Sequence, residues 1–139
     1  MPTHISNSEE DTKKFAANLA KKITSGVIAL SGELGAGKTT FVQGFAKGLG
    51  IKEKIISPTF VLIRQHKIPK TSKILYHIDL YRLEDNLHFQ NLGLEEIISN
   101  PKNLILIEWA EKIAKNLPKN TLQIKLEKKN DTIRSITLS

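Results

Sequence analysis

The sequence of 139 residues contains no cysteine, which excludes disulfide frameworks, thiolate metal sites and cysteine nucleophiles. It also lacks long hydrophobic runs: the longest apolar stretches, such as residues 104–107, are far shorter than the ~20 residues that cross a bilayer. Its first residues do not follow the charged-then-apolar pattern of a secretory signal. We therefore expect a cytoplasmic protein with no membrane partner and no disulfide-bonded partner.

Arginine is scarce, and the only three are Arg64, Arg82 and Arg134. Lysine nevertheless gives the chain a net charge of +7, with 21 basic against 14 acidic residues. Such a surplus suits contact with nucleic acid or an acidic partner, and it equally suits a solvated lysine-rich surface. With 40% hydrophobic residues, a chain of this length forms a core without metal or disulfide, so we expect a single domain over residues 1–139.

The apolar pattern predicts helices and strands in alternation. The first expected element is a helix with Ser8 as its N-cap, which Gly26 would end. Further helices are expected over residues 38–49, 94–98 and 110–116, and strands over residues 27–31, 60–67, 73–80 and 104–108. Apolar residues alternate with polar ones near 122–126 and 133–138, which predicts a terminal hairpin. This order indicates a three-layer α/β fold with a mainly parallel central sheet and a C-terminal antiparallel hairpin.

A phosphate-binding loop follows the first predicted buried strand. Residues 32–39 read GELGAGKT and match the pattern G-x-x-x-x-G-K-[ST] at every fixed position. The glycines allow consecutive backbone N–H groups to wrap a phosphate at the start of the next helix. Lys38 would reach the β- and γ-phosphates, and the Thr39 hydroxyl would bind Mg²⁺. The loop, between a strand and a helix, indicates a P-loop NTPase-like fold that binds a nucleoside triphosphate.

Two acidic residues end predicted strands and are candidates to act at the γ-phosphate. Asp79 follows residues 74–78, and Glu108 follows residues 104–107. In an open α/β sheet, ligands bind at the carboxyl ends of the strands. A carboxylate after four buried apolar residues is costly unless it meets a cation, which favours Glu108. A cap or an ion pair is the alternative for Glu108, and for Asp79 the alternative is capping of the turn into Tyr81.

Four more residues have a functional and a structural interpretation, and both stay open. Thr59 could offer oxygen to the γ-phosphate or Mg²⁺, or it could belong to a plain turn. His77 shares a strand face with Asp79, where it could act in catalysis or simply pack. Trp109 could stack on a base or be an ordinary half-buried tryptophan. Arg82 could contact phosphate or form a surface ion pair.

Five segments together resemble the bacterial TsaE (YjeE) family in order and spacing. They are residues 32–40 (GELGAGKTT), 57–60 (SPTF), 77–82 (HIDLYR), 92–94 (LGL) and 108–111 (EWAE). The loop motif is common to P-loop proteins. The HIDLYR and EWAE segments, in that order within so short a chain, make the resemblance specific, and it extends over almost the whole chain.

The resemblance implies a role for each residue that matches a family motif. The implied nucleotide-binding residues are Glu9, Leu34, Gly35, Ala36, Gly37, Lys38, Thr39, Thr40, Asp79, Trp109 and Glu111. The implied magnesium ligands are Thr39 and Glu108, and the implied catalytic residues are Lys38, Thr59, Asp79 and Glu108. The implied cofactors are ATP and Mg²⁺.

Membership would imply an ATPase required for threonylcarbamoyladenosine modification of tRNA, at the adenosine next to the anticodon. Its partner would be a TsaD–TsaB-type transferase complex, with tRNA involved at least indirectly. Two other functions share the phosphate loop: a nucleoside or nucleotide kinase, and a non-catalytic module gated by nucleotide. A kinase usually needs several arginines and a lid, for which this chain has little room. The sequence contains no Asn-Lys-x-Asp segment to read guanine, which disfavours a GTP switch.

Overall fold

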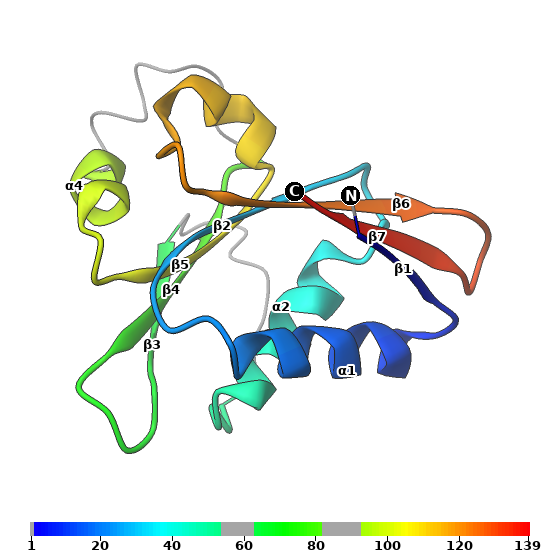
Figure 1. Cartoon of the computed structure of the whole chain (residues 1–139), viewed down its shortest axis with the longest axis horizontal. Coiled ribbons are helices and arrows are strands. Elements are labelled where there is room, and N and C mark those ends of the chain that lie inside the picture. The colour runs from blue at the N-terminus through cyan, green and yellow to red at the C-terminus, as the bar shows by residue number, and fades with distance from the viewer. Residues whose placement is uncertain (1, 54–62, 82–92) are drawn as a thin grey trace.

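A seven-stranded mixed sheet forms the centre of the protein, in the order β1-β7-β6-β2-β5-β4-β3 (Figure 1). The structure is a computed structural model, and it describes residues 2–53, 63–81 and 93–139. The strands are β1 (Thr3–Ser6), β2 (Gly26–Ser31), β3 (Ile63–Lys67), β4 (Ile74–Asp79), β5 (Leu104–Glu108), β6 (Leu122–Lys128) and β7 (Arg134–Leu138). The helices are α1 (Glu9–Ala20), α2 (Lys38–Gly48), α4 (Leu94–Ser99) and the 3₁₀ helix η1 (Ala110–Asn116).

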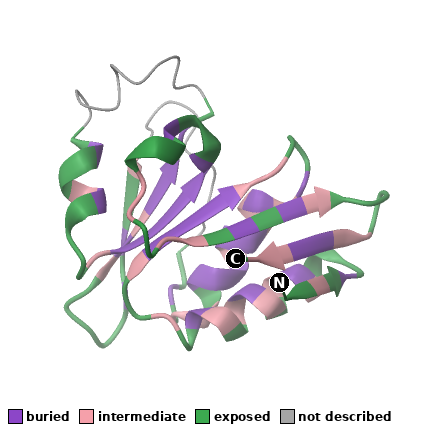
Figure 2. Ribbon diagram, turned by 45° about the horizontal axis from the view of Figure 1, so that its top comes forward, coloured by how far each residue is buried: buried purple, intermediate pink, exposed green. Residues whose placement is uncertain are grey.

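Helices cover both faces of this sheet and complete the three predicted layers. α1 and α2 pack on one face, around Phe41 and Phe45, while α4 and η1 pack on the other, around Leu94 and Ile113 (Figure 1). Every residue of β5 is buried, as a run of consecutive apolar residues predicts for a central strand (Figure 2). Within the described ranges, no helix has the length and apolar character needed to cross a membrane.

The strand pairing confirms the predicted sheet. β2 lies between β5 and β6 and is parallel to both, and β4 is parallel to β5. β6 and β7 form the predicted antiparallel hairpin, and β3 pairs antiparallel with β4 at the far edge. This topology brings the carboxyl ends of β2, β4 and β5 to one edge of the sheet, with Asp79 and Glu108 in register as neighbours.

The first helix is shorter than predicted. α1 begins after the N-cap Ser8, whose side chain accepts a hydrogen bond from the Asp11 backbone, but it ends at Ala20. Gly26 does not end this helix; it is the first residue of β2, with a φ of 104° and a 2.7 Å hydrogen bond from its N–H to the Asn103 carbonyl. The helical repeat misled because Ile23, in the loop, still packs against the same core as the helix.

Several element bounds differ from the prediction: α2 ends at Gly48 rather than at 49, and β4 covers Ile74–Asp79 rather than 73–80. One strand was not predicted. α4 runs one residue further than expected, η1 is a 3₁₀ helix with a non-helical residue at Ile113, and residues 60–62 of the predicted strand 60–67 lie outside the described residues. The strand that the sequence did not predict is β1, which pairs antiparallel with β7. It is a short edge strand of four residues, of which two are exposed and the buried one is a serine, so it lacks the apolar alternation that marks a strand in a sequence.

The two helices on one face cross at very close range because α2 has glycine at the contact. A Cβ added to Gly44 would lie 2.4 Å from the Cα of Lys13, and a Cβ added to Gly48 would lie 2.5 Å from the carbonyl oxygen of Ala17. Both obstacles are backbone atoms of α1. The spacing of four residues on each helix places these two contacts one turn apart. α2, which carries the start of the phosphate site, is thereby fixed against α1.

Candidate functional site

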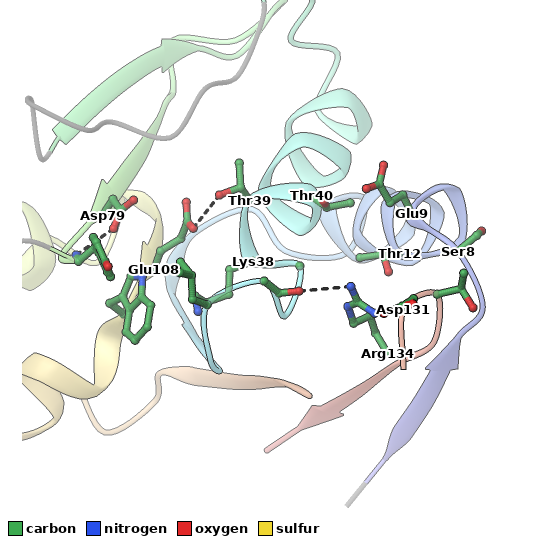
Figure 3. Close-up of a pocket in the computed structure, with 16 residues that line it drawn as sticks. Ser8, Glu9, Thr12, Lys38, Thr39, Thr40, Asp79, Glu108, Asp131 and Arg134 are labelled. Atoms are coloured by element: carbon green, nitrogen blue, oxygen red, sulfur yellow. Dashed lines mark hydrogen bonds between the residues drawn. The ribbon is translucent and has the colours of Figure 1, made fainter. Parts of the chain in front are cut away.

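A cavity of about 720 Å³ opens at the sheet edge where β2, β4 and β5 end (Figure 3). The loop after β2, the start of α1 and the turn between β6 and β7 form its walls. It is lined by Ser8, Glu9, Thr12, Leu34, Gly35, Gly37, Lys38, Thr39, Thr40, Asp79, Tyr81, Glu108, Trp109, Asp131, Thr132 and Arg134. Most residues that the resemblance implicates therefore border one cavity, although they come from four separate segments.

The loop from β2 to α2 has the backbone conformation that a phosphate loop needs. Gly32 has a φ of 141°, and a Cβ there would lie 2.3 Å from the carbonyl oxygen of Leu126. Gly37 precedes α2 with a φ of 100°. Ala36, which the resemblance also implicates, is buried beside Gly32 rather than lining the cavity, whereas Leu34 is 74% exposed at the loop's tip. The loop thus leads into the N-terminus of α2, where free backbone N–H groups attract anions.

Lys38 is the cation within the loop and lies almost buried, with 5% of its surface exposed. Its Nζ donates to two carbonyl oxygens of the loop, that of Gly32 and, at 3.1 Å, that of Glu33. The same Nζ lies 3.9 Å from the centre of the Trp109 ring, a cation–π contact. Loop carbonyls and an indole ring together hold the ammonium group.

The electrostatics of Lys38 combine an unfavourable and a favourable effect. Burial lowers the pKa of Lys38, because removal from water disfavours the charged amine. Glu111, Glu108 and Asp79 oppose this shift, because their negative charges favour the ammonium form. Glu111 does not line the cavity, so its contribution here is the field that it exerts on the lysine.

Glu108 connects the loop helix to the neighbouring strands. Its Oε1 accepts a 3.0 Å hydrogen bond from the Thr39 hydroxyl (Figure 3), and its Oε2 lies 2.5 Å from Nε2 of His77. A hydroxyl and a carboxylate at this distance fit Mg²⁺, which prefers oxygen and binds through one or two side chains plus substrate phosphates. Among the described residues there is no cluster of three His, Asp or Glu side chains that could hold a metal by itself.

Asp79 lies beside Glu108 and lines the cavity while also capping a turn. It is 6% exposed, and its Oδ1 accepts a 2.9 Å hydrogen bond from the Tyr81 backbone N–H. The turn-capping alternative that the sequence left open is therefore present. Capping through one oxygen leaves Asp79 at the cavity wall, so the two interpretations are compatible.

Trp109 occupies a strained position in the cavity wall, beside Lys38. Its φ of 60° is uncommon for a residue other than glycine, and such strain concentrates at functional sites. Its ring faces Lys38 and lies 5.2 Å from the Tyr81 ring, centre to centre. The structure thus gives Trp109 a cation and an aromatic neighbour.

The far end of the cavity includes residues that sequence reasoning missed. Asp131, Thr132 and Arg134 come from the terminal hairpin, opposite Glu9 on α1 (Figure 3). One guanidinium nitrogen of Arg134 donates to the Gly35 carbonyl oxygen at 3.3 Å. The only signal in the sequence for Arg134 was that arginine is scarce, and no motif connected this residue with the loop. Thr59 and Arg82 lie outside the described residues, so their predicted roles remain predictions.

Comparison with known proteins gives consistent matches over nearly the full length. The family model described as "Threonylcarbamoyl adenosine biosynthesis protein TsaE" matches residues 6–136. The chain is 42% identical to the tRNA threonylcarbamoyladenosine biosynthesis protein TsaE of Bacillus subtilis, over 94% of this chain and 80% of that protein. It is 39% identical to the protein of the same name from Treponema pallidum, over 97% of this chain and 98% of that protein.

A solved structure gives the same assignment. The crystal structure of Bacillus subtilis YdiB superposes with a TM-score of 0.81 at 36% sequence identity, over 99% of this chain and 83% of that one. The fold described above is thus shared with a solved structure. The chain belongs to the TsaE family of threonylcarbamoyladenosine biosynthesis proteins.

Proposed function

We propose that this protein is a magnesium-dependent ATPase that acts on a TsaD–TsaB-type transferase complex during threonylcarbamoyladenosine modification of tRNA. The observation that carries the proposal is the 3.0 Å hydrogen bond between Thr39 and Glu108. It joins the start of the phosphate-loop helix to an acid at the end of the adjacent parallel strand. That arrangement suits hydrolysis of a nucleotide as well as its binding.

The lining of the cavity supports one orientation of the nucleotide, with the phosphates at one end and the base at the other. Backbone N–H groups of residues 35–40 and the ammonium group of Lys38 would hold the phosphates. The triphosphate would point toward Asp79 and Glu108. The ribose and base would then extend past Thr40 toward Glu9 and the hairpin residues, at the other end of the same cavity.

Each protein group would have a distinct task in hydrolysis. Mg²⁺, when bound with ATP, would neutralise charge on the β- and γ-phosphates. Thr39 and Glu108 would hold it through their oxygens, and Lys38 would leave the loop carbonyls for the phosphate oxygens. Asp79 and Thr59 would orient groups around the γ-phosphate, and Glu111 would keep Lys38 charged. Trp109 would cover the phosphate end.

Glu108→Gln tests whether the site hydrolyses ATP. The amide keeps an acceptor for the Thr39 hydroxyl but removes the charge that attracts a metal. We expect the rate of ATP turnover in the presence of the transferase complex to fall at least ~10-fold, since electrostatic groups of this kind contribute that much or more. Release of inorganic phosphate measures this rate. Affinity for ATP without Mg²⁺ should change little.

Glu95→Gln provides the control, because Glu95 is an exposed acid on α4 outside the cavity. Its turnover should equal that of the unmodified protein. Unchanged turnover in Glu108→Gln would instead favour a nucleotide-gated module without catalysis.

Stimulation of ATP consumption distinguishes an ATPase that acts on proteins from a kinase. We expect the TsaD–TsaB-type complex to raise the rate of phosphate release, because hydrolysis would serve that assembly. Nucleosides and nucleotides offered as acceptors should leave the rate unchanged and should not become phosphorylated, as mass spectrometry would measure. A phosphorylated small molecule would overturn the ATPase proposal in favour of the kinase.

A further inference from the structure

We propose that His77 is a positioning residue for the magnesium site: it holds the Glu108 carboxylate in the orientation that a metal needs. The inference rests on the proposed function, because it assigns His77 to the metal that Thr39 and Glu108 would bind. The His77 side chain is buried; it is not part of the phosphate loop and does not line the cavity.

The sheet aims His77 at Glu108. His77 and Asp79 lie on the same face of β4, and Asp79 is in register with Glu108 on the parallel strand β5. The imidazole is completely buried, and Nε2 lies 2.5 Å from Oε2 of the carboxylate. An ionised carboxylate has no proton to give, so the imidazole donates through its Nε2–H.

The two carboxylate oxygens of Glu108 therefore have different partners. Oε2 is held by His77, while Oε1 accepts from Thr39, the other implied magnesium ligand. A hydrogen bond from Nε2 fixes the rotation of the carboxylate and leaves Oε1 directed at the threonine. Partners of this kind behind a metal-binding group typically account for about 10- to 100-fold in metal affinity or activity.

A purely structural role explains His77 poorly. In the part of the chain that the structure describes, Nδ1 of His77 is buried without a hydrogen-bond partner. An unsatisfied buried polar atom is destabilising, whereas an apolar side chain would fill the same position without that cost. The interaction that accounts for a histidine at this position is therefore the one made by Nε2. Among the described residues, the hydrogen-bond partner of Nε2 is Glu108.

The test measures how much Mg²⁺ is needed to promote ATP binding, by equilibrium dialysis with labelled ATP over a Mg²⁺ series. We expect His77→Leu to raise the half-maximal Mg²⁺ concentration about 10- to 100-fold, with ATP affinity in EDTA unchanged. His77→Gln keeps an N–H donor near the position of Nε2, so it should restore most of the Mg²⁺ response. Thermal unfolding verifies that each variant is folded. If His77→Leu does not fold, His77→Asn takes its place, because the shorter amide of asparagine does not reach Glu108.

His66→Leu is the matched control. His66 is also buried, also pairs with a glutamate, Glu53, and also has one ring nitrogen without a partner among the described residues, but it lies outside the cavity. It should leave the Mg²⁺ response unchanged. An equal shift in His66→Leu and His77→Leu would overturn the proposal, because loss of any buried histidine would then suffice.

A double-mutant cycle establishes whether His77 acts through Glu108. In a Glu108→Gln background, His77→Leu should change the Mg²⁺ response by less than about twofold, since the group it positions is gone. Shifts that multiply independently would overturn the inference. If the unmodified protein responds to Mg²⁺ and His77→Leu behaves identically, this inference alone fails. If the unmodified protein binds ATP without regard to Mg²⁺, the proposed function fails and the inference fails with it.

Discussion

Lys38→Ala is expected to lower ATP affinity by about 100-fold or more, the largest effect of any single substitution in the cavity. At 4 Å and an effective dielectric of about 20, one charge pair contributes about 4 kcal/mol before desolvation. Even half of that energy corresponds to more than a tenfold change in affinity for each phosphate contact that is lost. Titration calorimetry with ATP and Mg²⁺ measures the change directly.

Lys47→Ala is the control for this experiment, because Lys47 lies exposed on the same helix and outside the cavity. Its affinity for ATP should match that of the unmodified protein. Circular dichroism of both variants shows whether they are folded. Folded Lys38→Ala protein with undiminished affinity would contradict the assignment of the loop as the phosphate site.

Gly44→Ala is expected to lower the free energy of unfolding by about 1 kcal/mol net. The new methyl group would meet backbone atoms of Lys13 at 2.4 to 2.8 Å, so the two helices must move apart. Overpacking of this kind costs about 1–3 kcal/mol, although alanine favours a helix over glycine by about 1 kcal/mol. The double variant with Gly48→Ala should lose more, because Gly48 meets Ala17 in the same way.

Urea denaturation measures this loss, and the opposite signs of the two contributions make the result informative. Lys47→Ala introduces alanine at an exposed position of the same helix and should change the free energy of unfolding little. If Gly44→Ala stabilised the protein as helix propensity alone predicts, the close approach of α1 and α2 would be wrong.

The central architecture could be predicted because its signals are local. Four consecutive apolar residues predict the buried strand β5, and the glycines with Lys38 and Thr39 specify the phosphate loop by themselves. The glycine after the C-cap of α2 also follows a local rule: Gly50 has a φ of 86° and its N–H donates to the Lys47 carbonyl at 3.0 Å. Such features depend on neighbours in the chain, so the sequence displays them directly.

The remainder depended on contacts between distant segments. β1 exists because it pairs with β7 at the other end of the chain, and no local pattern announces it. The contact between Arg134 and Gly35 spans 99 positions and arises only when the hairpin folds beside the loop. The contact of His77 with Glu108 requires β4 and β5 to be neighbours in register. The sequence therefore indicated the chemistry of the site, and the topology supplied these partners.

Trp109 is the only tryptophan in the chain, and its ring lies directly beneath the ammonium group of Lys38. In the proposed nucleotide complex that group would move to a phosphate, and the indole would lose a cation from its face. Because the chain has a single tryptophan, its tryptophan emission originates at one place, beside Lys38 in the cavity. Binding of a nucleotide could then be followed by tryptophan fluorescence in unlabelled protein, including during rapid mixing, without a dye that could disturb the protein.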